Sequence, residues 1–495
     1  MNTKQLRQKI LDLAIRGKLV PQDPNDEPAS LLLERVRAEK ERLIIEGKIK
    51  RDKRDSAVSR GDDKSHYGNI PGGWTTAPIS DLCIVNPRNV VDDSINVSFV
   101  PMALVEDGFS NHFGFEEKPW EKVKTGFTHF QEGDVGLAKI TPCLENRKSV
   151  VFRGLTNEMG AGTTELHIFR PFCVDTILPE YLLWFFKSER FISGCIGAFS
   201  GAVGQQRVGK DYVAATYLPV PPFSEQRRIV VAVESAFAVI EEIERNKTDL
   251  QAAVTAAKSK ILSLAIRGKL VSQDPNDEPA SVLLERVRAE REALAKAGKI
   301  KRGKGDSAIE KSCDNSYYSA LPESWEICCL DDIGFTNIGL TYKPTDICDN
   351  GIPVLRSNNI QDGRLDLSDL VRVDTPLNEN LELHEGDIII CARNGSRHLV
   401  GKCALVPELS EKMTFGAFMA VYRSICNDYV YYFLHTDNFR SIFQSEGIST
   451  QINQLTQAMI KQTVIPLPPI AEQRRIVTAI DEAFKQLDNI TAMLA

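Results

Sequence analysis

Apolar residues spaced alternately by four and three positions predict a long amphipathic helix in the middle of the chain. This series begins at Ile229 and continues through Val233, Ala236, Ile240, Ile243, Lys247, Leu250, Val254, Ala257, Ile261 and Leu264, with Lys247 as its only polar member. Such spacing is typical of a coiled-coil seam, because it keeps one apolar stripe facing a partner helix. A helix from Glu225 to Ile266 would be about 63 Å long at 1.5 Å per residue.

The same spacing recurs at both ends of the chain. Near the C-terminus it comprises Ile476, Ile480, Ala483, Leu487, Ile490 and Leu494, and near the N-terminus Leu6, Ile10 and Leu13. Gly17 and Gly268 follow helical patterns, and we expect them to end those helices in the left-handed conformation. The turn sequences PQDPNDEP and SQDPNDEP come next, and a second helix is expected after each, from about Pro28 to Glu46 and from about Pro279 to Ala297.

Long internal repeats account for this recurrence. Residues 10–39 and 261–290 differ at 3 of 30 positions at an offset of 251, and LPVPPFSEQRRIV from Leu218 returns as IPLPPIAEQRRIV from Ile465 at an offset of 247. Under these offsets the C-terminus leads almost directly into the N-terminus, as in a circle. We therefore expect the two terminal segments to meet and to imitate the unbroken central helix. Each EQRR segment is expected to be a joint between a globular domain and its helix.

Two inserts interrupt the repeats, at residues 71–218 and 322–465, and they share little sequence. Each has the size of one small domain. Strand-like runs bounded by turn residues occur at Ser98–Leu104, Asp134–Ile140, Gly351–Leu355 and Asp387–Ala392, and helices are expected at Pro179–Phe191 and Cys426–Gln444. The expected fold class is therefore mixed α/β, with two globular α/β domains separated by long antiparallel coiled-coil helices in a circular pseudo-two-fold repeat.

Composition and charge narrow the functional classes. The 495 residues are 42% hydrophobic and 26% charged, with a net charge of −7, which is ordinary for a soluble globular protein. No run of about 18 apolar residues could cross a bilayer, and the charged N-terminus does not resemble a secretory signal, so a cytoplasmic location is expected. The 11 cysteines include no CxxC pair and no Cys/His cluster, so we expect reduced thiols and no metal site.

The sequence contains no recognisable catalytic motif. GxSxG, HExxH, the kinase set and a G-x-G-x-x-G between a strand and a helix are all missing. Two segments approach the phosphate-binding loop, Gly204–Lys210 and Gly298–Lys304, but each lacks the Ser or Thr that would hold magnesium. The chain is therefore expected to be non-catalytic.

Both inserts instead contain polar loops rich in side chains that read base edges and phosphates. Any one such loop could be a solvated turn, but their recurrence at similar places in two copies favours a binding role. We select as DNA-binding candidates in the first insert Lys139, Thr141, Asn146, Arg147, Lys148, Thr163, Thr164, Ser200, Gln205, Gln206 and Arg207. In the second insert we select Arg356, Ser357, Asn358, Asn359, Arg393, Asn394, Ser396, Arg397, Lys402, Thr450, Gln451 and Gln454.

Several motifs in a fixed order resemble the specificity (S) subunits of type I restriction–modification enzymes. Each insert opens with PGGW…ISDLC or PESW…LDDIG, continues with GDVGLAKITPCLENRKSVV or GDIIICARNGSRHLVGKCALV, and closes with LPVPPFSEQRRIV or IPLPPIAEQRRIV. Together these motifs cover nearly the whole chain. Their order, repeated twice with circular closure, is more specific than any one of them.

The resemblance implies a DNA-recognition role without catalysis. Each insert would be a target recognition domain that reads one half of an asymmetric, bipartite site on double-stranded DNA. The helices would set the spacer and dock two methyltransferase (M) subunits, through residues such as Ile229, Val233, Ile240, Leu250, Val254, Ile261, Ile476, Ile480 and Leu487. Restriction (R) subunits would complete the complex. This chain would hold no cofactor, whereas S-adenosylmethionine, ATP and Mg are expected on the partner subunits, where adenine is methylated.

The expected domains follow from the motifs and the repeats. They are an N-terminal helical arm (1–50), a linker (51–69), target recognition domain 1 (70–224), a central helical spacer (225–302), a second linker (303–318), target recognition domain 2 (319–470) and a C-terminal spacer helix (471–495).

Two other functions remain open from sequence alone. The first is a stand-alone, sequence-specific DNA-binding regulator that uses the coiled coil as a frame. The second is a coiled-coil scaffold whose inserts bind proteins. Because affinity for DNA comes largely from neutralising phosphates, the net charge of −7 leads us to expect that methyltransferase partners supply much of the positive charge.

Overall fold

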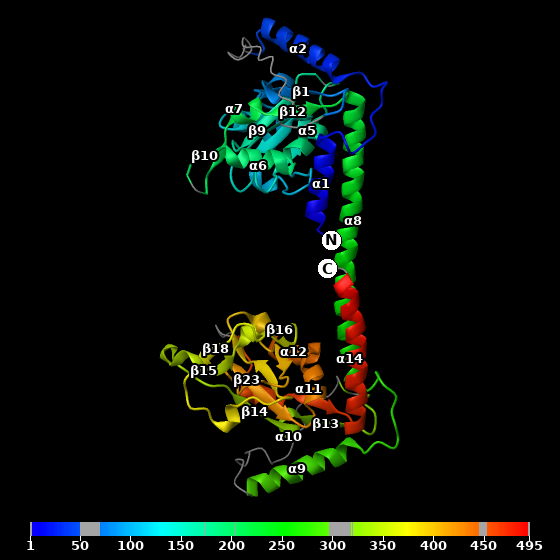
Figure 1. The fold of residues 1–495 in the computed structure, drawn as a ribbon, viewed down its shortest axis with the longest axis vertical. Coiled ribbons are helices and arrows are strands. Elements are labelled where there is room, and N and C mark those ends of the chain that lie inside the picture. The colour runs from blue at the N-terminus through cyan, green and yellow to red at the C-terminus, as the bar shows by residue number, and fades with distance from the viewer. Residues whose placement is uncertain are drawn as a thin grey trace. The chain divides into compact units, whose positions relative to one another are not determined.

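The computed structural model describes residues 2–49, 70–173, 175–202, 204–296, 318, 320–444 and 453–493. Two compact units make up the chain, residues 1–246 and 247–495, and the boundary falls inside the long helix α8 (Phe223–Ala265, 43 residues). Each unit combines antiparallel and mixed sheets with helices, one of which packs along that unit's own part of α8 (Figure 1). This mixed α/β architecture confirms the predicted fold class. The linker predicted at 51–69 and nearly all of that at 303–318 lie outside the described residues.

In the first unit, helix α1 (Thr3–Ile15) packs against the N-terminal part of α8. Leu11, Ala14 and Ile15 are buried in the same apolar cluster as Ile229 and Val233 of α8. The buried Arg7 extends from α1 to Glu244 and donates two hydrogen bonds to its carboxylate, at 2.9 and 3.0 Å. The predicted apolar stripe of α8 therefore faces a partner helix here, as a coiled-coil seam requires. The stripe predicted for α1 is displaced by one residue, since Leu6 is 37% exposed and Ile10 and Leu13 are half-buried, while the neighbouring positions are buried.

The second unit repeats this arrangement with helix α14 (Ile470–Met493) against the C-terminal part of α8. Ile476 and Ile480 are fully buried in the cluster that contains Leu262, and Lys258 pairs with Asp488 at 2.5 Å. Not every predicted seam position is buried, because Ile243, Leu250 and Ile490 are 39 to 40% exposed. The predicted meeting of the two chain ends concerns segments of different units and stays a prediction.

Glycines end the helices as predicted. After α1, Gly17 adopts φ +65° and the next amide, that of Lys18, donates to the Leu13 carbonyl at 2.8 Å. Gly268 adopts the same φ after α8, and Lys269 donates to the Leu264 carbonyl at 2.9 Å. This pattern is the Schellman motif. The second helices follow as expected, α2 over Ala29–Ile45 and α9 over Ala280–Lys296.

The EQRR segments are joints, as predicted, and their acidic residue is the centre of each joint. Buried Glu225 accepts hydrogen bonds from Trp74 Nε1 at 2.9 Å and Gln22 Nε2 at 2.7 Å, while Arg228 pairs with Asp26 of the PQDPNDEP turn. The second unit repeats these bonds with Glu472, Trp325, Gln273, Arg475 and Asp277. Burial raises the pKa of both glutamates. Each joint thus ties the helix start to the turn and to the first strand of its insert.

Two four-stranded sheets form most of the first insert. The antiparallel sheet has the order β2-β9-β6-β7, with bounds Cys83–Val85, Leu166–Pro171, Val135–Ala138 and Ser149–Val151. The mixed sheet has the order β4-β3-β8-β5, with bounds Glu116–Pro119, Asn96–Val100, Met159–Gly162 and Thr128–Gln131. The ribbon of β1 (Thr75–Pro78) and β12 (Tyr217–Val220) brings the two ends of the insert together, and β10 (Phe199–Ser200) pairs with β11 (Arg207–Val208).

Short helices complete the first insert. They are α3 (Ile79–Leu82), α4 (Trp120–Val123), α5 (Pro179–Phe186), α6 (Glu189–Gly197) and α7 (Lys210–Ala215). The strand predicted at Ser98–Leu104 is too long, since β3 stops before Pro101 and a 3-10 turn follows at Met102–Leu104. The single helix predicted at Pro179–Phe191 is two helices. Ser188 is extended there and caps α6 by accepting from the Phe191 amide.

The second insert repeats the antiparallel sheet in the order β14-β23-β19-β21, with bounds Gly334–Ile338, Met419–Ser424, Ile388–Cys391 and Cys403–Leu405. A second, three-stranded sheet has the order β18-β15-β22, with bounds Val371–Val373, Ile347–Leu355 and Thr414–Phe415. Three ribbons pair β13 (Glu326–Cys329) with β25 (Val464–Leu467), β16 (Ile360–Gln361) with β17 (Arg364–Leu365), and β20 (Arg393–Asn394) with β24 (Asn453–Gln454).

Helices α10 (Leu330–Ile333), α11 (Asn427–Leu434), α12 (Asp437–Gln444) and α13 (Gln457–Gln462) surround these strands. The single helix predicted at Cys426–Gln444 is again two, because Thr436 interrupts it and its hydroxyl accepts from the Phe439 amide. The two inserts therefore share a sheet order and a broken helix pair despite their different sequences.

Candidate nucleic-acid interface

The loop after β6 places some of its predicted DNA-binding side chains at the surface and others inside. Asn146 is exposed, and Lys139 and Thr141 are half-buried. The Thr141 hydroxyl donates to the carboxylate of Glu145, four residues later. The backbone amide of Asn146 donates to the Pro142 carbonyl, and the backbone carbonyl of Asn146 accepts from the Gly108 amide. The backbone at Asn146 is therefore held on both sides.

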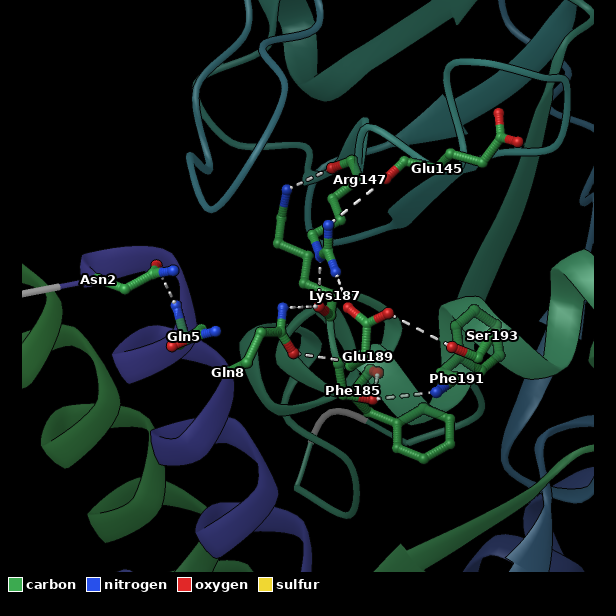
Figure 2. Close-up of polar contacts among 11 residues, drawn as sticks. Asn2, Gln5, Gln8, Glu145, Arg147, Phe185, Lys187, Glu189, Phe191 and Ser193 are labelled. Atoms are coloured by element: carbon green, nitrogen blue, oxygen red, sulfur yellow. Dashed lines mark hydrogen bonds and ion pairs between the residues drawn. The ribbon is translucent and has the colours of Figure 1, made fainter.

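Arg147 and Lys148, both predicted to contact DNA, turn inward from this loop. Arg147 is 6% exposed, and Figure 2 shows its side chain directed toward Lys187 and Glu189. Its guanidinium donates to the Lys187 carbonyl at 3.1 Å and pairs with the Glu189 carboxylate. Lys148 donates to the carbonyl of Val105 at 2.7 Å. Contact with DNA through either cation would require these internal bonds to break, so their bonding in the structure is that of packing residues.

The N-terminal helix is joined to the same region. Gln8 of α1 donates to the Lys187 carbonyl at 3.2 Å and accepts from the Glu189 amide at 2.7 Å (Figure 2). These bonds cap the junction between α5 and α6. Helix α1 is therefore held both to α8 and to the insert of its own unit.

The other polar loops of the first insert gather around β10 and β11. Ser200 and Gln205 are exposed and Gln206 is half-buried, while Thr164 is exposed beside the half-buried Thr163. Arg207 on β11 donates two hydrogen bonds of 2.9 Å to the Glu165 carboxylate, and its side chain remains 42% exposed. The ion pair with Arg207 lowers the pKa of Glu165. An arginine fixed in this way presents its remaining face without losing much side-chain freedom on binding.

In the second insert, the loop after β15 is partly structural. Asn359 is 1% exposed and donates to the carbonyls of Asp366 and Asp369, so it holds the loop rather than facing solvent. Asn358 is exposed and Arg356 half-buried, and both contact the carboxylate of Asp369, at 3.2 and 3.5 Å. Lys402 resembles Lys148 in donating inward, to the Ile360 carbonyl at 2.7 Å.

The loop after β19 lies beside this one. The side-chain nitrogen of Asn394 donates to the Ser357 hydroxyl at 3.1 Å, and this bond connects the two loops. The side-chain oxygen of Asn394 accepts from the backbone amide of Ser396 within its own loop. Ser396 and Arg397 are exposed. The guanidinium of Arg393 lies over the ring of Phe418, 5.4 Å from its centroid.

Strand β24 brings the exposed Gln454 opposite Arg393 in register. The predicted residues Thr450 and Gln451 lie outside the described residues.

Sequence reasoning missed the two residues that hold these arginines. Glu165 and Phe418 each come directly before a strand, β9 and β23, and each contacts the arginine of its unit. Neither belongs to a motif. The sequence carried no clear signal for Phe418, because the segment around it, MTFGAFMAVY from Met413, reads as an apolar strand.

Within the described ranges, no group of three or more His, Cys, Asp or Glu is placed to hold a metal ion. None of the helices over the same residues is both long and apolar enough to span a bilayer.

Residues 322–494 match the family described as the type I restriction modification DNA specificity domain. The chain is 35% identical to the EcoAI specificity subunit and 34% identical to the EcoEI specificity subunit, both type I restriction enzyme subunits of Escherichia coli. These alignments cover 98% and 99% of this chain, and 90% of each relative.

Two solved structures share the fold at 18% sequence identity. One is a chain from a structure that concerns complex assembly and conformational transition of the type I R-M system, with a TM-score of 0.62 over 86% of this chain and 94% of that chain. The other is the HsdS subunit of Thermoanaerobacter tengcongensis, with a TM-score of 0.53 over 87% and 94%. Together with the near full-length sequence matches, these findings show that the chain belongs to the family of type I restriction enzyme specificity subunits.

Proposed function

We propose that this chain recognises a bipartite, asymmetric DNA site within a type I restriction–modification complex, with one half-site read by each insert. The observation that carries this proposal is the repetition of one sheet order, β2-β9-β6-β7 and β14-β23-β19-β21, under loops of different sequence. Base edges are recognised by side-chain donors, acceptors and apolar groups. Two inserts that share a sheet but differ in their polar loop side chains are therefore suited to recognise two different DNA sequences.

The helices have a separate role in this proposal. Helix α8 contributes residues to both units, and its 43 residues span about 64 Å at 1.5 Å per residue. This length exceeds the roughly 34 Å of one helical turn of B-DNA. We assign to α8 and to its partner helices the setting of the spacer between half-sites and the docking of two methyltransferase subunits. The near identity of residues 10–39 and 261–290 supports two copies of one partner.

The proposal places all covalent chemistry on other subunits. S-adenosylmethionine would be bound by the methyltransferase subunits, which would methylate adenine, and ATP and Mg by the restriction subunits. This chain would supply only the sequence specificity. The matches to specificity subunits do not favour a stand-alone regulator or a protein-binding scaffold.

Purification of the chain alone and of the chain co-expressed with methyltransferase subunits of a type I system tests the proposal. The net charge of −7 should leave the chain alone with weak, salt-sensitive DNA binding, whereas the complex should bind one bipartite sequence and methylate it with added S-adenosylmethionine. Tight, sequence-specific binding by the chain alone would favour the regulator. In the complex, Arg207→Ala and Arg393→Ala should weaken DNA binding, and a scaffold would be unaffected by both substitutions.

A further inference from the structure

One backbone junction occurs in both units beside the polar loops. In the first unit, Lys139 directly follows β6, and its amide donates to the carbonyl of Glu165, directly before β9, at 3.0 Å. The carbonyl of Lys139 accepts from the Val208 amide of β11 at 2.9 Å. Three segments that are distant in sequence therefore meet at Lys139.

The second unit builds the same junction from different residues. Ala392 directly follows β19, and its amide donates to the carbonyl of Phe418, directly before β23, at 2.9 Å. The carbonyl of Ala392 accepts from the Leu455 amide, just after β24, at 2.8 Å. By these bonds, Lys139 corresponds to Ala392 and Glu165 corresponds to Phe418, although no sequence motif connects them.

Each junction holds an arginine against the residue that precedes the strand. In the first unit, Arg207 makes two hydrogen bonds of 2.9 Å to Glu165. In the second unit, Arg393 lies over Phe418 at 5.4 Å. We refer to Arg207–Glu165 and Arg393–Phe418 as the junction pairs. The two arginines do not occupy equivalent positions, because Arg207 lies on β11 and Arg393 directly follows Ala392. Each nevertheless contacts the residue at the equivalent position before the strand. That residue has a carboxylate in the first unit and an aromatic ring in the second.

Phe418 has the features of a contact residue. Phe418 is 60% exposed after Gly416 and Ala417 in the short loop between β22 and β23, at a position where the other unit has a glutamate. The apolar surface of an exposed ring stabilises a complex when binding removes it from water. The neighbouring Asn394–Ser357 hydrogen bond fixes the loop that presents Arg393. The ring and the guanidinium thus form one preorganised surface of apolar and donor groups.

We propose that the junction pairs are specificity-determining contacts, each reading one or two adjacent base pairs of its unit's half-site. The inference rests on the proposed function and names the residues that perform it. Arginine donors match O6 and N7 of guanine, a carboxylate accepts from N4 of cytosine, and a phenylalanine contacts the methyl group of thymine. The first pair is therefore suited to a G·C pair, and the second to a guanine next to a thymine.

The test is adenine methylation by the complex of this chain with its methyltransferase subunits, read by single-molecule sequencing of host DNA. The wild-type complex first defines the bipartite motif. Phe418→Ala should then relax the preference at one base pair of one half-site by roughly 5- to 150-fold, the range for a lost base contact, and leave the other half-site unchanged. Glu165→Ala should do the same in the other half-site.

Phe335→Ala is the matched control, because Phe335 is a 52% exposed phenylalanine of the same sheet, opposite Arg423 at the far end of β23. It should leave the motif unchanged. If Phe418→Ala abolishes all methylation, Phe418→Leu is measured in its place, because it keeps an apolar group but loses the flat ring that lies over Arg393. Complex assembly and melting temperature are measured for both variants. A preference that is relaxed at one base pair, in the variant that still methylates DNA, supports the proposal. An unchanged preference in that variant, or complexes that assemble with both variants yet methylate no site, overturns it. A wild-type complex without any bipartite motif would instead contradict the proposed function itself.

Discussion

The amine of Lys187 is fully buried between two backbone carbonyls, those of Gly108 at 3.0 Å and Arg147 at 2.7 Å. A neutral amine has two N–H groups and can make both bonds. Burial, reinforced by the nearby Arg147 and partly offset by Asp107, lowers the pKa of Lys187 from its usual 10.5 to about 7. Sequence reasoning could not foresee this cluster, because Arg147 turns inward at a φ of +60° that its loop composition does not indicate.

A pH-dependent stability follows at this residue. Between about pH 7 and 10.5, Lys187 is protonated in the unfolded chain and neutral in the folded chain. Because the unfolded state binds more protons in this range, the free energy of unfolding increases as the pH rises. The melting temperature of the wild type should therefore increase relative to that of Lys187→Met between pH 7 and 10. Calorimetry over this range measures the difference. The matched control is Lys210→Met, because Lys210 is exposed. Its melting temperature should differ from that of the wild type by the same amount across this pH range. A difference between the wild type and Lys187→Met that is also constant with pH would contradict the lowered pKa of Lys187.

At the scale of elements, the long helices and the glycines that end them were predictable, whereas the short strands and the breaks within the shorter helices were not. The seam, the C-cap glycines and the EQRR joints depend on local periodicity and turn chemistry, which the sequence displays directly. Two-residue strands such as β10 and β11 form only because the chain is held by its surroundings. The breaks at Ser188 and Thr436 are local N-caps, in which each hydroxyl accepts from the amide three residues later, and the apolar residues on both sides concealed them in the sequence.

Gly17 tests the helix ends. A Cβ at Gly17 would lie 2.4 Å from Pro71 Cγ at φ +65°, whereas a Cβ at Gly47, φ +71°, would meet no atom within 4 Å. Gly47→Ala should therefore lower the free energy of unfolding by about 1 kcal/mol, because alanine is strained at a positive φ. Gly17→Ala should lower it by about 2–4 kcal/mol, because Pro71 must also shift to make room for the added Cβ. Denaturant unfolding monitored in the first unit measures both free energies. Equal losses would show that the contact with Pro71 does not matter.

The length of α8 is a second element-scale prediction. Seven residues inserted between Asn246 and Lys247 nearly preserve the helix face and lengthen α8 by about 10 Å, or roughly three base pairs at 3.4 Å each. The methylated motif should then acquire a spacer that is longer by about that number. Five inserted residues turn the helix by about 140° and should abolish methylation. A spacer that does not change with the seven-residue insertion would reject α8 as the determinant of spacing.

At the scale of the whole molecule, duplication organises the chain. The repeats predicted two similar frames, and the structure has two units with matching sheets and matching Glu225 and Glu472 joints. The reading surface could not be predicted equally well. Of the selected side chains, Arg207 and Arg393 lie at equivalent junctions, while Arg147, Lys148, Asn359 and Lys402 bond within their units, because loop composition does not reveal the direction of a side chain.

The central claim is that each insert reads one half-site independently of the other. Its most direct test is single-molecule methylome sequencing of a host that carries this chain and its methyltransferase subunits, with residues 71–218 either native or replaced by the corresponding insert of another specificity subunit. The account predicts a bipartite adenine-methylated motif in which one half changes on replacement and the other half is retained. A replacement that alters both halves, or neither, in a complex shown to assemble and to methylate DNA would contradict it.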